Sequence, residues 1–188
     1  MEDQTSEHLE HAEHAGHAAH EGNPFIITVS VTIAILAVVA ATIGSLETIE
    51  SGAAIAAKNQ AVLMQSQASD KWAEYQAKSL KKNLLEIAVA SDNPKAEEYS
   101  KTVTRYEEEG KEISKEAKEF EKQRDENLHE ADHHEHRHHV LTTGVTLLHV
   151  AIAVATIAII TKGQKWPWYL SILMGLAGVA VSAYAYKG

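Results

Sequence analysis

Cysteine is absent from this sequence of 188 residues, and proline occurs only three times. Without cysteine the chain has no disulfides, no thiolate nucleophile and no cysteine ligand for zinc. Basic residues are also few, since 17 Lys and Arg stand against 26 Asp and Glu, and the net charge is -9. Nucleic acid is therefore not expected as a partner, because phosphate binding requires a basic surface.

Familiar catalytic patterns are missing as well. The sequence has no glycine-rich phosphate loop, no HExxH motif and no Ser, His and Asp arrangement typical of hydrolases. The nearest approach is His133-His134-Glu135-His136, whose spacing is too short for a metalloprotease site. We therefore expect that the protein is not an enzyme.

Charged residues are also absent from three long apolar stretches, residues 25–46, 140–161 and 168–186. Each is about as long as a bilayer is thick at ~1.5 Å per helical residue, and a charge buried in lipid is costly. The pattern predicts three transmembrane helices, with Pro167 breaking the chain before the third, 168–188. The lipid bilayer is the first expected partner.

The third stretch carries two further signals. Small residues at spacings of three and four would let another helix approach closely, namely Ser171, Gly175, Gly178 and Ser182. Aromatic residues predict a belt at each lipid–water interface, with Trp166, Trp168 and Tyr169 at one end and Tyr184 and Tyr186 at the other.

Residues 47–139 contain one proline and few glycines, so they are predicted to be helical almost throughout. The break is the turn at 91–94, because Pro94 disfavours helix at the preceding residue and can itself begin the next helix. Two antiparallel helices of about 45 residues, each roughly 65 Å long, would form a hairpin stalk. The expected fold class is all-α, with three transmembrane helices and this coiled-coil stalk inserted between the first and second.

Each stalk helix carries an apolar stripe. On the returning helix, steps of four and three give a coiled-coil seam of Tyr99, Val103, Tyr106, Gly110, Ile113, Ala117, Phe120 and Arg124. On the outgoing helix the stripe is less regular: Ile49, Ala53, Ala57, Met64, Ala68, Trp72, Tyr75, Leu80, Leu84 and Ile87. Gly110 and Arg124 mark either a register device or a local opening. Because one pair of helices buries only a narrow stripe, we expect several copies to associate.

A family resemblance covers residues 25–188. It is carried by residues 65–81, which read QSQASDKWAEYQAKSLK and lie after one apolar stretch and before a charged helix and two more apolar stretches. In this arrangement the chain resembles the DUF4337 family of bacterial membrane proteins. The resemblance implies a bacterial, three-span protein with a coiled coil, and it supplies no catalytic residues.

All but one of the 12 histidines fall in two clusters. The acidic tail, residues 1–24, holds His8, His11, His14, His17 and His20, and the second cluster holds His129, His133, His134, His136, His138 and His139. Pairs of imidazoles at these spacings suit a divalent transition metal such as Zn, Cu or Ni. The alternatives are a disordered, solvated tail with incidental metal binding, a polar collar at the lipid headgroups, and a response to pH.

His149 is the one titratable residue deep within an apolar stretch. An ionisable group in a membrane is a candidate functional residue, although a neutral histidine can also hydrogen-bond a neighbouring helix. Glu47 and Glu50, after the first stretch, would line a pore entrance in an oligomer or lie at a solvated helix end. Conduction would require assembly, because three spans with mostly apolar faces offer no obvious water-filled path.

Three functional hypotheses follow. The first is a homo-oligomeric membrane scaffold or partner-binding protein that projects a coiled-coil bundle, with a possible protein partner on the stalk. The second is a metal-binding or metal-handling membrane protein that uses both histidine clusters, and the third is an oligomeric channel or transporter. The expected location is the bacterial inner (cytoplasmic) membrane. Lys162 and Lys165 favour a cytoplasmic tail and a periplasmic stalk.

Overall fold

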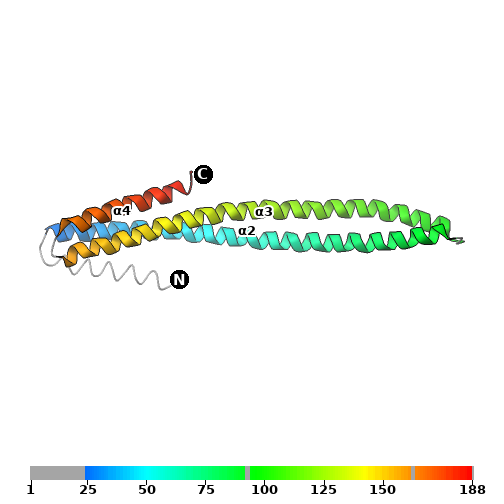
Figure 1. The fold of residues 1–188 in the computed structure, drawn as a ribbon, viewed down its shortest axis with the longest axis horizontal. Helices are drawn as coiled ribbons and strands as arrows, with labels where there is room; N and C mark the ends of the chain where they lie inside the picture. The colour runs from blue at the N-terminus through cyan, green and yellow to red at the C-terminus, as the bar shows by residue number, and fades with distance from the viewer. Residues whose placement is uncertain (1–23, 92–93, 162–163, 188) are drawn as a thin grey trace. The chain divides into compact units, whose positions relative to one another are not determined.

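The computed structural model describes residues 24–91, 94–161 and 164–187. Within these ranges the chain forms three α-helices and no strand: α2 (Pro24–Ala90), α3 (Ala96–Ile160) and α4 (Lys165–Tyr184) (Figure 1). The all-α prediction is confirmed, and the two long helices pack against each other. The tail histidines His8, His11, His14, His17 and His20 lie outside the described residues.

The two long helices continue through the positions where the apolar stretches meet the charged segment. α2 has 67 residues and α3 has 65, and neither is interrupted at 46/47 or at 139/140. No proline stands at these junctions, so the backbone hydrogen bonds of the helix continue without a gap. By length and composition, all three helices could cross a membrane.

Both expectations for proline need correction. Pro94 does not begin a helix, because it forms a turn together with Lys95, and α3 starts at Ala96. Pro167 does not separate the second and third apolar helices, since it lies in the first turn of α4. The first amides of a helix have no partner within the helix, so proline is tolerated there.

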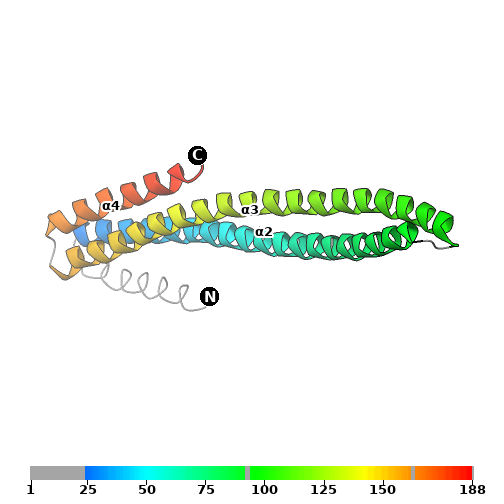
Figure 2. The same cartoon turned by 45° about the vertical axis from the view of Figure 1, so that its right-hand side comes forward.

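The chain divides into two compact units, Met1–Ala53 with His133–Gly188 and Ala54–Asp132. We name them the three-helix unit and the hairpin unit. In the three-helix unit, α4 lies alongside α2 and α3 (Figure 2), and residues of all three helices pack in one apolar core. Val29 and Ile33 of α2 and Leu141 and Leu148 of α3 belong to this core, and all four are buried.

Small residues bring α3 and α4 into close contact. The predicted set Ser171, Gly175, Gly178 and Ser182 is buried along α4, together with Pro167. A Cβ atom added at Gly144 of α3 would lie 2.9 Å from the carbonyl oxygen of Gly178 and would collide with the hydroxyl of Ser182. The expected close helix approach is therefore confirmed, and Gly144 is the partner that the sequence did not reveal.

In the hairpin unit α2 and α3 run antiparallel, and the residues predicted for the seam of α3 are buried or half-buried, with Ile113 and Ala117 buried. The stripe predicted for α2 is correct at Ala57, Met64 and Ala68, which are buried, and at the half-buried Trp72 and Tyr75, which contact α3. Three of its large residues in this unit are exposed instead, namely Leu80 (62%), Leu84 (58%) and Ile87 (68%), and so is Ile49 (64%) in the three-helix unit. The buried side of α2 follows alternating steps of three and four residues, through Ala54, Ala57, Ala61, Met64 and Ala68. The large exposed residues therefore lie on the opposite side of the helix.

Candidate functional site

A cluster of polar side chains lies within the three-helix unit where its three helices meet. Glu50 of α2 is only 6% exposed, although it is a carboxylate. His134 and Arg137 approach it from α3, and Tyr186 approaches it from the segment after α4. We name these four residues the Glu50 cluster. A buried carboxylate of this kind is stable only when it is paired and hydrogen-bonded.

His134, Arg137 and Tyr186 all face the Glu50 carboxylate. The Nδ1 atom of His134 lies 2.5 Å from Oε2, and the hydroxyl of Tyr186 donates to Oε1 at 3.1 Å. A guanidinium nitrogen of Arg137 lies 4.0 Å from Oε1, and the same guanidinium stands 5.4 Å from the centre of the Tyr186 ring. The carboxylate therefore ties α3 and the end of α4 to α2.

The surroundings of Glu50 act on its pKa in opposite directions. Burial raises the pKa, because the charged form is poorly solvated. The hydrogen bonds from His134 and Tyr186 and the positive charge of Arg137, together with that of His134 when it is protonated, lower it by more, and the pKa lies below its ordinary value of 4.5. Glu50 is thus ionised at neutral pH and accepts hydrogen bonds from both partners.

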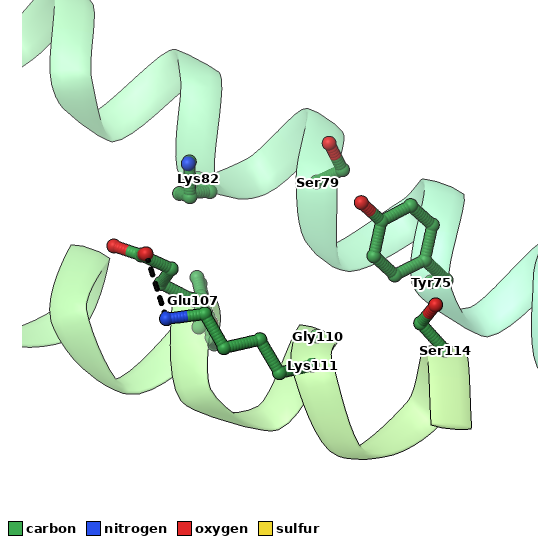
Figure 3. Close-up of a pocket in the computed structure, with 8 residues that line it drawn as sticks. Tyr75, Ser79, Lys82, Glu107, Gly110, Lys111 and Ser114 are labelled. Carbon is green, nitrogen blue, oxygen red and sulfur yellow. Dashed lines mark ion pairs between the residues drawn. The ribbon is translucent and has the colours of Figure 1, made fainter. Parts of the chain in front are cut away.

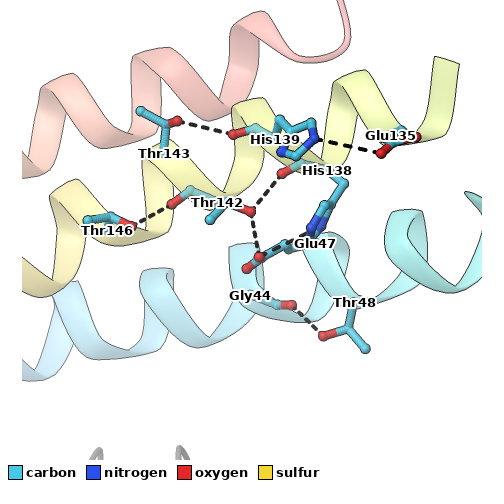
Figure 4. Close-up of polar contacts among 9 residues, drawn as sticks. All are labelled: Gly44, Glu47, Thr48, Glu135, His138, His139, Thr142, Thr143 and Thr146. Atoms are coloured by element: carbon cyan, nitrogen blue, oxygen red, sulfur yellow. Dashed lines mark hydrogen bonds and ion pairs between the residues drawn. The ribbon is translucent and has the colours of Figure 1, made fainter. Parts of the chain in front are cut away.

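A second carboxylate, Glu47, lies one helical turn before Glu50. Figure 4 shows it beside Thr142 and His138 of α3. The hydroxyl of Thr142 donates to Glu47 Oε1 at 2.6 Å, and Nδ1 of His138 lies 3.7 Å from the same oxygen. Along α3, Nε2 of His139 lies 3.9 Å from Glu135. Several imidazoles of the second cluster therefore face carboxylates.

The remaining predicted histidines are spread around α3. His134 and His138 are half-buried, whereas His129, His133, His136 and His139 are exposed. Among the described residues, no three His, Asp or Glu side chains are grouped so that they could hold a metal ion. Metal binding by this cluster stays a prediction. His149 is half-buried on α3, and its role in a channel also stays a prediction.

The hairpin unit contains an opening beside Gly110 (Figure 3). A cavity of about 390 Å³ is lined by Tyr75, Ser79, Lys82, Tyr106, Glu107, Gly110, Lys111 and Ser114. A Cβ atom at Gly110 would lie 3.5 Å from the ring of Tyr75, which is an ordinary contact distance, so the space beside the glycine could hold a side-chain carbon. Gly110 therefore marks a local opening.

Arg124, by contrast, helps to set the register of the hairpin, which is the other role that the sequence analysis considered for these two residues. Its guanidinium donates to the side-chain oxygen of Gln65 on α2 at 2.6 Å. Nearby, the indole N–H of Trp72 donates to Glu121 at 2.9 Å. These contacts join residues far apart in the sequence, so they help to fix the register of the two helices.

Sequence reasoning named Glu50 but missed its partners Arg137 and Tyr186. A weak signal was present, because Glu47 and Glu50 are three residues apart on one helical face directly after an apolar stretch. Three membrane crossings would place the end of the third apolar stretch on the same side as the end of the first, but the sequence did not show which residues there contact Glu50.

The comparisons with known proteins give one family. A search of the curated proteins and of the solved structures finds no match. The family model described as a domain of unknown function, DUF4337, matches residues 25–188. This range contains the three helices, the Glu50 cluster and the hairpin unit. The chain therefore belongs to the DUF4337 family.

Proposed function

We propose that this protein is a membrane-anchored, homo-oligomeric scaffold. The three-helix unit is the anchor, because aliphatic side chains cover its outside, among them Ile35 (59% exposed), Val38 (67%), Leu173 and Leu176 (both 65%). Water would solvate these side chains poorly, whereas lipid solvates them well. The hairpin unit, with its many charged residues, lies outside the lipid.

One observation carries the homo-oligomeric part of the proposal. The interface of the hairpin is built mostly from alanine, with Ala54, Ala57, Ala61, Ala68 and Ala117 buried, and it buries little apolar area. The large residues Leu80, Leu84 and Ile87 remain exposed on the same unit. Exposed aliphatic side chains in a row mark an interaction surface in soluble segments. Association of several copies would cover them.

The experiment is multi-angle light scattering on the full chain in mild detergent, with the detergent contribution subtracted. A protein mass of two or more times 20.5 kDa, the mass of one chain, supports the proposal. A strictly monomeric particle at all concentrations overturns the homo-oligomer. Extraction of the chain from membranes by carbonate without detergent would overturn the anchor.

A further inference from the structure

The outward face of α2 in the hairpin unit is almost free of charge. It consists of the exposed positions opposite the buried seam: Ile55, Ala56, Asn59, Val62, Leu63, Ser66, Ser69, Asp70, Ala73, Gln76, Ala77, Leu80, Asn83, Leu84 and Ile87. Asp70 is the single charged residue in this set. The exposed face of a helix normally carries its charged residues, so this composition is inverted.

The outward face of α3 has the opposite composition. Its exposed positions are Thr104, Arg105, Glu108, Lys111, Glu112, Lys115, Lys118, Glu119, Lys122, Asp125, Glu126 and His129. All of them except Thr104 and His129 carry a formal charge. This face is suited to water, and burying it would require many charges to lose their hydration.

Two lysines of α2 are directed toward α3 instead, while the exposed charged residues Lys58, Glu74, Lys81 and Glu86 lie at the sides of the outward face. The ammonium group of Lys71 lies 2.6 Å from Glu116, and that of Lys78 lies 2.8 Å from Glu109. The hydrogen bonds to these carboxylates raise the pKa of both lysines, so each stays protonated well above neutral pH. Lys71 and Lys78 therefore form ion pairs within the hairpin and add no charge to the outward face of α2.

We propose that the outward face of α2 binds the same face of a second copy, with the two helices parallel. This inference rests on the proposed function, because anchoring in one membrane gives the copies a common direction. In a parallel two-fold pair each residue lies near its own counterpart. The face of α3 would then place like charges together, which is unfavourable, whereas on α2 only Asp70 would do so.

The size of the face fits a pair of helices. Residues 55–87 extend over about 50 Å, and a helix face is about 10 Å wide. A pair would then bury on the order of 1,000 Å², which is near the lower limit for specific interfaces. Anchoring in one bilayer raises the effective concentration of the copies. The small residues Ser66, Ser69 and Ala73 in the middle of the face allow the helices to approach closely.

The test uses the absence of cysteine, because every introduced cysteine is then unique. Leu84→Cys and Ser69→Cys report on α2, and Thr104→Cys and Lys118→Cys are exposed controls on α3. Each full-length variant is treated in its native membrane with a short bismaleimide, which avoids copper oxidants that histidines would bind. We expect dimers of twice 20.5 kDa from the α2 variants, at least about tenfold more abundant than from the α3 variants.

The outcomes separate this inference from the proposed function. An oligomer by light scattering that cross-links equally or better through α3 overturns the α2 contact and leaves the scaffold in place. A monomer by light scattering overturns both. A cross-linked product of another mass assigns the face to a different protein and also overturns the inference. Quenching of a fluorophore at Leu84→Cys by brominated lipid tails would assign the face to the bilayer surface and would overturn it as well.

Discussion

The three-helix unit and the hairpin unit use small residues and charges in different ways. In the three-helix unit, glycine and serine bring helix backbones together, and the charged groups of the Glu50 cluster are held inside. In the hairpin unit, alanines form the seam, the lysines of α2 reach across to α3, and large aliphatic residues remain outside. The first unit thus buries its charged cluster within its own contacts, whereas the second leaves large aliphatic side chains exposed, and the proposed pairing of copies would cover them.

The largest effect is expected from a charge placed on the outward face of α2, because this face is proposed to bind a second copy. We expect Leu84→Glu to weaken self-association about 100-fold, because like charges would meet in the contact between copies. The fold of the hairpin should be unchanged, since Leu84 is 58% exposed. The measurement is dissociation on dilution by light scattering, with circular dichroism as a check of the fold. Lys118→Glu on α3 is the control, and an equal loss in that variant would contradict the comparison.

Replacing glycine by alanine at two positions tests the close contact between α3 and α4 in the three-helix unit. Gly144→Ala should destabilise this unit by about 1–3 kcal/mol, because the added Cβ meets the backbone of α4. Gly52→Ala should be neutral or stabilising by up to about 1 kcal/mol, because nothing lies within 4 Å of its Cβ. Denaturant unfolding in detergent measures both. Equal effects would show that α3 and α4 do not touch at Gly144.

The Glu50 cluster predicts a dependence of stability on pH. Because the folded protein lowers the pKa of Glu50 below 4.5, ionised Glu50 stabilises the fold above that pH. This contribution is lost as the pH falls through the folded value. Glu50→Gln should cost about 1–3 kcal/mol at pH 7, since hydrogen bonds to a charged group are lost.

The difference between wild type and Glu50→Gln should shrink as the pH falls below 4.5. Unfolding midpoints at several pH values measure it. Glu135→Gln, at a carboxylate that is 41% exposed, is the matched control and should show a smaller effect. A difference that stays constant down to strongly acidic pH would contradict the role of the Glu50 carboxylate.

The smallest expected effect concerns the register of the hairpin unit. Trp72→Phe removes the hydrogen bond to Glu121 and should cost about 1 kcal/mol. Trp166→Phe removes a bond to Gln164, two residues away in the sequence, and should have almost no effect on stability. Thermal unfolding followed by circular dichroism compares the two. Equal losses would show that the contact between the helices does not hold them in register.

Much of the fold followed from local sequence rules. The seam of α3 from Tyr99 to Arg124 and the buried small residues of α4 depend on spacing along one helix, and the break before α3 depends on the backbone restriction of Pro94. Such spacing can be read without knowing the neighbours. The α2 stripe failed because that helix carries two sets of small and apolar residues at similar spacing. The sequence prediction assigned large apolar residues such as Leu80 and Leu84 to the buried side, but the structure exposes them.

The sequence by itself determined three apolar helices, a helical hairpin and the positions of the charges, because these depend on composition and helical period. Only the tertiary structure decided which side of α2 faces α3, that Gly144 meets Gly178, and that Tyr186 and Arg137 join Glu50. These contacts link residues far apart in the chain. Their energy depends on the distance and burial of both partners, and a one-dimensional pattern carries neither quantity.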